Sequence, residues 1–132
     1  MPERYSIGQL ARLSGCKAET IRYYERIRLI PPPQRAASGY RTYGEDDVRR
    51  LRFVRHGREL GFPLDAIRAL LDLSDHPNRD CAAADRLCSA QLADVRDRIR
   101  SLQRLEAELS SILDQCRGGR VADCRVLEAL SD

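Results

Sequence analysis

The chain has 132 residues, 33% of them charged and only 5% aromatic, so its length allows no more than one ordinary domain. No run of 18 apolar residues occurs, which excludes a membrane-spanning helix. The N-terminus also lacks the apolar core of a signal peptide, so we expect a cytoplasmic protein without membrane contact. In a reducing compartment its five cysteines are typical of thiols or metal ligands rather than of disulfides.

Charge is distributed unevenly along the chain. Residues 1–58 hold 13 Lys/Arg against 6 Asp/Glu, a net +7, whereas residues 59–132 hold 10 against 14, a net −4. A basic first half favours a polyanionic partner such as nucleic acid, and a solvated surface with chance asymmetry is the alternative. Neither histidine adjoins a candidate nucleophile, and no Gly-rich loop suits a phosphate, so we expect no enzyme.

Two short helices are predicted at the start of the chain. Ser6 and Gln9 have the spacing of a capping box, and Ser14-Gly15-Cys16 breaks the first helix before a second from about residue 17 to residue 28. Two helices joined by a short Gly-containing turn form the helix-turn-helix pattern. The second helix has an exposed face suited to phosphates and guanine edges. Its members are Lys17, Thr20, Arg22, Tyr23 and Arg26.

A β-hairpin, or wing, is predicted over residues 36–43, after three prolines that cannot continue a helix. Its Tyr40, Arg41 and Tyr43 would form a second contact surface for a duplex. The alternative is that Tyr43 packs on the core. Two connector helices follow, one opening at residues 45–47 and one after Pro63. We therefore assign residues 1–75 to a winged helix-turn-helix domain and residues 76–80 to a hinge loop.

Residues 81–116 predict one long helix that pairs with another helix. They contain no Pro or Gly, and an apolar seam continues through five heptads. Cys81 and Cys116 are 35 residues apart, roughly 52 Å along a helix, so they cannot meet within one chain. Antiparallel pairing of residue i with residue 197 − i would place Cys81 of one chain beside Cys116 of the other, with Ile99 near the dyad. Cys88 is interpreted as a seam residue and Cys16 as a partly buried filler.

The motifs Tyr5-Ser6-Ile7-Gly8-Gln9-Leu10-Ala11, Thr20-Ile21-Arg22-Tyr23-Tyr24-Glu25 and Ser38-Gly39-Tyr40-Arg41-Thr42-Tyr43 resemble the MerR family of bacterial transcription regulators. The resemblance extends over essentially the whole chain. It implies a mainly α fold: a winged helix-turn-helix domain, a long antiparallel coiled-coil dimerisation helix, and a short C-terminal metal-binding loop at residues 117–132.

The same resemblance implies a homodimer on a pseudo-palindromic promoter. It would bend and untwist DNA whose spacer is too long for productive engagement of RNA polymerase, and ligand binding would turn repression into activation. By this resemblance Arg22, Tyr23, Tyr24, Tyr40 and Arg41 occupy positions used for DNA contact.

The cysteines then indicate a branch of the family. Cys116-x7-Cys124 resembles the loop of metal sensors, and Cys81 stands where sensors of divalent metals carry a cysteine and copper(I) sensors a serine. With antiparallel pairing, Cys116 and Cys124 of one chain meet Cys81 of the other. Three thiolates suit mercury, lead or cadmium, whereas zinc usually takes a fourth ligand. His76 is a candidate nitrogen donor, and Asp80 and Asp123 are weaker oxygen donors.

Three other interpretations stay open at the level of sequence. Cys116 and Cys124 would form a disulfide in a thiol redox sensor, or would bind copper(I) without Cys81. A structural or metal-buffering coiled-coil protein would have no need of DNA, and the basic residues 17–41 argue against it.

Overall fold

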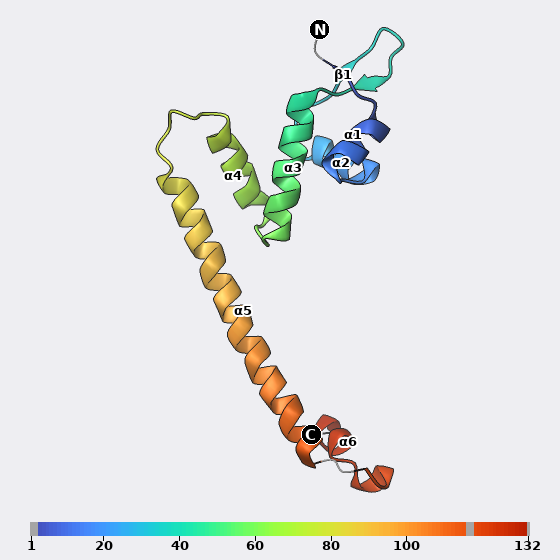
Figure 1. Ribbon diagram of the computed structural model, residues 1–132, viewed down its shortest axis with the longest axis vertical. Helices are drawn as coiled ribbons and strands as arrows, with labels where there is room; N and C mark the ends of the chain where they lie inside the picture. Colours follow the sequence, from blue (N-terminus) through green and yellow to red (C-terminus); the bar gives the residue numbers. More distant parts are fainter. Residues whose placement is uncertain (1–2, 116–117, 132) are drawn as a thin grey trace. The chain divides into compact units, whose positions relative to one another are not determined.

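The computed structural model describes residues 3–115 and 118–131. Its elements are α1 (Ile7–Ser14), α2 (Ala18–Arg26), β1 (Gln34–Arg35), β2 (Arg41–Thr42), α3 (Glu45–Glu59), α4 (Leu64–Ser74), α5 (Ala82–Gln115), the 3-10 helix η1 (Val121–Asp123) and α6 (Arg125–Ser131) (Figure 1). Helices separated by a small two-stranded wing confirm the predicted mainly α class. No helix among the described residues is both long enough and apolar enough to cross a membrane. The chain divides into two units, residues 1–87 and 88–132.

The first helix begins and ends where its local sequence predicts. The Ser6 hydroxyl accepts a hydrogen bond from the Gln9 N–H, and the Gln9 side chain accepts one from the Ser6 N–H, which completes the capping box. Gly15 ends α1 in the left-handed region with φ 75°, a conformation that costs glycine little. Ser6 and Gln9 therefore set the start of α1, and Gly15 sets the turn into α2.

The second helix ends two residues earlier than predicted. α2 stops at Arg26, and Arg28 has a positive φ of 59°. The guanidinium of Arg68, on α4, donates to the backbone carbonyls of Ile27 and Arg28, at 2.8 Å each. These bonds satisfy carbonyls that a helix end leaves without partners, so a residue 40 positions away fixes this boundary.

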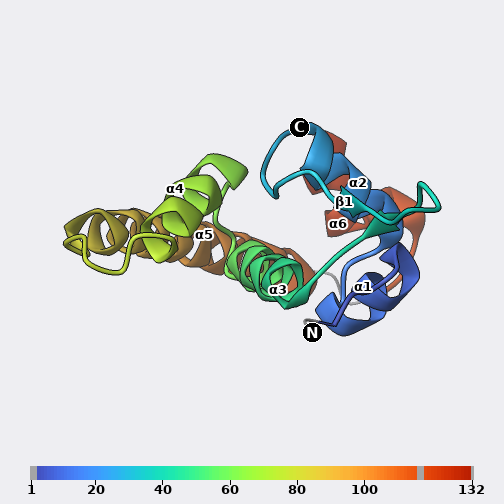
Figure 2. The same ribbon diagram turned by 90° about the horizontal axis from the view of Figure 1, so that it is seen from above.

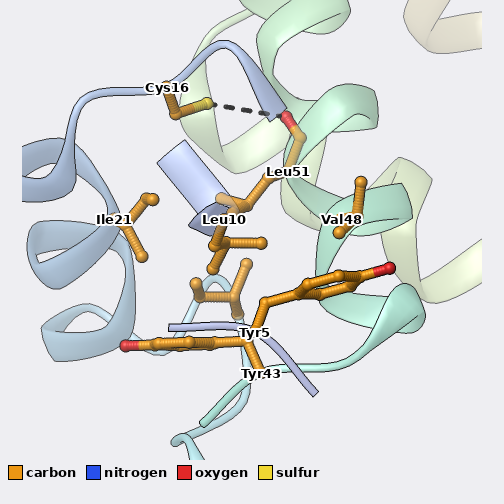
Figure 3. Close-up of a cluster of buried hydrophobic side chains, with 8 residues drawn as sticks. Tyr5, Leu10, Cys16, Ile21, Tyr43, Val48 and Leu51 are labelled. Carbon is orange, nitrogen blue, oxygen red and sulfur yellow. Dashed lines mark hydrogen bonds between the residues drawn. The ribbon is translucent and has the colours of Figure 1, made fainter. Parts of the chain in front are cut away.

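One hydrophobic core joins α1, α2 and α3 to the base of the wing (Figure 3). Its buried members are Tyr5, Leu10, Cys16, Ile21, Ile30, Tyr43, Val48 and Leu51. The Cys16 thiol donates to the Leu51 carbonyl at 3.9 Å, and burial raises its pKa. The interpretation of Cys16 as a filler is confirmed, and the residue is buried rather than partly buried.

A second core lies between α3 and α4, so that α3 packs against α1 and against α4 (Figures 1 and 2). The two helices approach closely at Gly57, where an added Cβ would lie 2.9 Å from the Ile67 side chain. Leu87, in the second turn of α5, also packs on this core. The beginning of α5 therefore belongs to the N-terminal unit.

The wing is shifted from its predicted position. β1 begins at Gln34, two residues before the predicted hairpin, and pairs in antiparallel register with β2 through a turn in which Gly39 has φ 89°. A bridge between Tyr5 and Tyr43 ties the wing to the N-terminus. The Tyr5 hydroxyl donates to Glu45 at the start of α3, and this hydrogen bond raises the pKa of Tyr5 to about 12.

Candidate nucleic-acid interface and thiol site

α2 presents a cationic face opposite the buried Ile21. Lys17, Arg22, Tyr23 and Arg26 are exposed, whereas Thr20 and Tyr24 are half-buried. The Arg26 guanidinium lies 5.8 Å from the centre of the Tyr23 ring, close enough for a cation–π contact. This pairing positions one cation and one phenol hydroxyl on the same exposed surface.

A buried carboxylate connects this helix to the wing. The Glu25 side chain, only 9% exposed, accepts hydrogen bonds from the Tyr43 hydroxyl at 2.5 Å and from Arg41 at 3.3 Å. Burial, with the Glu25 hydrogen bond, raises the pKa of Tyr43. Tyr43 itself is 1% exposed, so its side chain lies in the core, as the alternative interpretation expected, while Arg41 is held by Glu25.

Glu25 was not predicted from the sequence to have a structural role, although its position on α2 indicated one. It follows Ile21 by four residues and so shares the inward face of α2. A charged residue on an apolar face indicates a buried partner. Only the structure identifies that partner, 18 residues further along the chain.

Replacing Glu25 by alanine is expected to lower the free energy of unfolding by about 1–3 kcal/mol, because the buried Tyr43 hydroxyl loses its acceptor. Glu19→Ala removes an exposed carboxylate from the same helix and should change stability by less than about 0.5 kcal/mol. Urea denaturation followed by circular dichroism measures both variants. Equal stability of the two variants would contradict the structural role of Glu25.

At the tip of the wing, Tyr40 is 78% exposed. The guanidinium of Arg35 donates to the Gly39 carbonyl at 2.9 Å and so braces the turn that carries it. Arg35 is a positively charged wing residue that was not among the DNA contacts predicted from the sequence. The tip therefore exposes the Tyr40 hydroxyl on a turn that the hydrogen bond from Arg35 to Gly39 stabilises.

The segment between α4 and α5 is tied to α3 and α4 by ion pairs. One Arg50 nitrogen donates to both carboxylate oxygens of Asp75, at 2.8 and 3.0 Å, and this hydrogen bond lowers the pKa of Asp75. Arg79 pairs with Asp72 at 2.9 Å. The His76 Nδ1 lies 2.8 Å from the Asp72 carbonyl oxygen, so one ring nitrogen of this candidate donor is engaged with α4.

The predicted thiol ligands lie in different units. Cys81 is exposed and directly precedes α5, where the Asp80 carboxylate accepts a hydrogen bond from the Ala82 N–H. Cys124 is half-buried and directly precedes α6, and Cys116 lies outside the described residues. Across residues 3–115 and 118–131, no group of three or more His, Cys, Asp or Glu side chains is arranged to hold a metal ion.

The apolar seam of α5 is uncovered in the single chain. No residue of α5 is buried, and seven of the large apolar side chains along it are 36–64% exposed. They are Leu92, Val95, Ile99, Leu102, Leu105, Leu109 and Leu113. An apolar row of this length on an exposed helix indicates a helical partner.

Two family models match the chain. "MerR HTH family regulatory protein" matches residues 5–74, and "MerR, DNA binding" matches residues 48–112. The chain belongs to the MerR family. Its helix-turn-helix, wing and long helix are therefore those of a DNA-binding transcriptional regulator.

Relatives within the MerR family have metal-linked names. A probable heavy metal-dependent transcriptional regulator of Haemophilus influenzae is 39% identical, with 96% of this chain and 98% of that protein covered. The regulator PbrR691 from Ralstonia metallidurans, in complex with lead(II), is 35% identical with a TM-score of 0.82, covering 96% and 98% of the two chains. MerR from Bacillus megaterium, in complex with mercury(II), is 32% identical with a TM-score of 0.74, covering 97% and 100%.

Proposed function

We propose that this MerR-family protein is a metal-responsive regulator of a promoter. It binds DNA as a homodimer and turns repression into activation when a soft divalent heavy metal binds. Lead, cadmium and mercury are the favoured effectors, and zinc is less favoured. The observation that carries the proposal is the uncovered apolar row on α5. In the sequence, Cys81 directly precedes this helix and Cys116 directly follows it.

DNA contact is assigned to the exposed face of α2 and to the wing. The exposed side chains assigned to DNA contact are Lys17, Arg22, Tyr23, Arg26 and Tyr40, and the half-buried Thr20, Tyr24 and Arg41 are assigned to the edge of the same surface. Cations supply the phosphate contacts that fix the protein on the duplex. Tyr43 supports this surface from the core through Glu25, which it shares with Arg41.

The metal site is assigned to two chains. An α-helix of 34 residues is about 51 Å long, so antiparallel pairing of two α5 helices would bring each Cys81 to the Cys116 and Cys124 of the other chain. Three sulfur donors fit a soft cation, which binds thiolate and displaces the thiol proton. Relatives with lead and mercury complexes support the same class of effector.

The contacts around Cys81 favour a direct route from metal to DNA. Along the chain, Cys81 lies between Arg79, which forms an ion pair with Asp72, and Leu87, which packs on the core of the N-terminal unit. A metal that joins Cys81 to the other chain therefore acts on the DNA-binding unit itself. A shift of the two DNA-binding units would change the bend of the bound duplex, which is the step that alters transcription.

The test is run-off transcription with purified protein, RNA polymerase and the promoter upstream of its own gene. We expect a salt-sensitive gel shift, repression without metal, and activation with lead, cadmium or mercury but not with peroxide. Activation by peroxide alone would favour the thiol redox sensor, and activation by copper(I) alone would favour the two-cysteine copper sensor. Absence of a salt-sensitive shift would contradict a DNA-binding role.

A further inference from the structure

Glu128 stands one helical turn after the proposed ligand Cys124. The Glu128 N–H donates to the Cys124 carbonyl at 3.1 Å, so Cys124 directly precedes the first turn of α6 and Glu128 follows it by four residues. Both residues line the same cavity, of about 410 Å³, together with Val121, Ala122, Leu127 and Ser131. The structure thus places a thiol and a carboxylate around one open space.

Glu128 currently has a partner that a cation can replace. Arg125 donates to Glu128 at 2.8 Å, and both side chains are more than half exposed. Exposed ion pairs of this kind contribute only about 0–1 kcal/mol. A bond from the carboxylate to a metal ion held by the neighbouring thiolate would readily exceed that energy.

We propose that Glu128 is an oxygen ligand of the metal held by Cys124, and that it leaves Arg125 to bind the ion. This inference rests on the proposed metal-sensing function and adds a fourth donor to the three thiolates. Mercury is satisfied by sulfur alone, whereas zinc takes four ligands and accepts carboxylate oxygen among them. Glu128 therefore determines whether the site holds zinc as well as the softer metals.

The test compares zinc and mercury binding to the reduced full-length protein. Zinc affinity is measured by competition with a chromophoric chelator, and mercury binding by thiolate-to-metal absorbance under a competing thiol. Glu128→Gln should lower zinc affinity by about 10–100-fold, the range seen when groups that support a metal site are removed. Mercury affinity should stay within about threefold, since its sulfur donors are untouched.

Two further variants make the test specific. Glu108→Gln removes the same charge from exposed α5 and should leave zinc affinity unchanged. Arg125→Gln releases Glu128 and should raise zinc affinity by up to about fivefold, the equivalent of one exposed ion pair. A fall in zinc affinity in Arg125→Gln would overturn the proposed exchange of partners.

Zinc affinity within twofold of the unchanged protein in Glu128→Gln, or an equal loss for zinc and mercury, would overturn the role of Glu128. The thiol site itself would survive that result, because mercury would still produce thiolate absorbance in the unchanged protein. If the unchanged protein gave no thiolate absorbance with either metal, both the role of Glu128 and the proposed function would fall.

Discussion

Replacing Cys81 by serine is expected to lower the affinity for lead, cadmium and mercury by at least about 100-fold, because an alcohol oxygen is a poor donor to soft cations. Promoter binding without metal should be unchanged, since Cys81 is exposed and lies outside both hydrophobic cores. Metal titration followed by thiolate absorbance, with a gel shift on the same sample, measures the two properties separately.

Cys88→Ser is the matched control for this substitution. It makes the same chemical change at another exposed position, one heptad further along, and should retain metal affinity within about threefold. A Cys81→Ser protein that still responded fully to all three metals would exclude Cys81 from the site.

Mixed dimers test whether the site is shared between chains. Neither Cys81→Ser nor Cys124→Ser alone should form a complete three-thiol site. A dimer of one chain of each kind should regain one complete site, because the intact Cys81 of one chain meets the intact Cys116 and Cys124 of the other. A mixed dimer without any complete site would exclude a three-thiol site that takes Cys81 from one chain and Cys116 and Cys124 from the other.

Features encoded by neighbouring residues were predictable from the sequence. The capping box at Ser6 and Gln9 and the turn at Gly15 involve groups a few residues apart, and both occur as expected. The heptad pattern likewise predicted α5 to within one residue at its described N-terminal end. In these cases the stabilising interaction and the sequence signal are the same short-range feature.

Features set by distant partners were not predictable from local patterns. The end of α2 depends on Arg68, and the burial of Glu25 depends on Tyr43. Leu87 lies beside the heptad seam, so periodicity did not indicate that it packs on the core of the N-terminal unit. For the same reason, the prediction of a hinge at residues 76–80 did not foresee two contacts on either side of Cys81 in the sequence. These are the ion pair of Arg79 with Asp72 and the packing of Leu87 on the core.

The thiol site is even less accessible to prediction from local patterns, because its proposed ligands come from two chains. A single chain offers Cys81 and Cys124 in separate units, and its described residues contain no metal-holding cluster. Only the apolar row on α5 indicates how a second chain would complete the site. The proposed function thus depends on one surface, and that surface can be tested directly.

Replacing Ile99 by aspartate is expected to separate the dimer. Ile99 is 48% exposed in the single chain and lies near the predicted dyad, so each dimer would bury two carboxylates close together. Burying an unpaired charge costs several kcal/mol, so we expect the dimer dissociation constant to rise at least about 1000-fold, equivalent to roughly 4 kcal/mol. Sedimentation equilibrium measures the change.

Ser101→Asp introduces the same carboxylate on the outer side of α5, off the seam, and should leave the dimer intact. Loss of the dimer in Ile99→Asp should also lower metal affinity by at least about 100-fold, as in Cys81→Ser, because each site takes sulfur from both chains. It should weaken promoter binding as well, because one DNA-binding unit reaches only one half-site. If Ile99→Asp remained dimeric with full metal affinity, the apolar row of α5 would not be the dimer interface. The pairing of Cys81 with the other chain's thiols would then lose its structural basis.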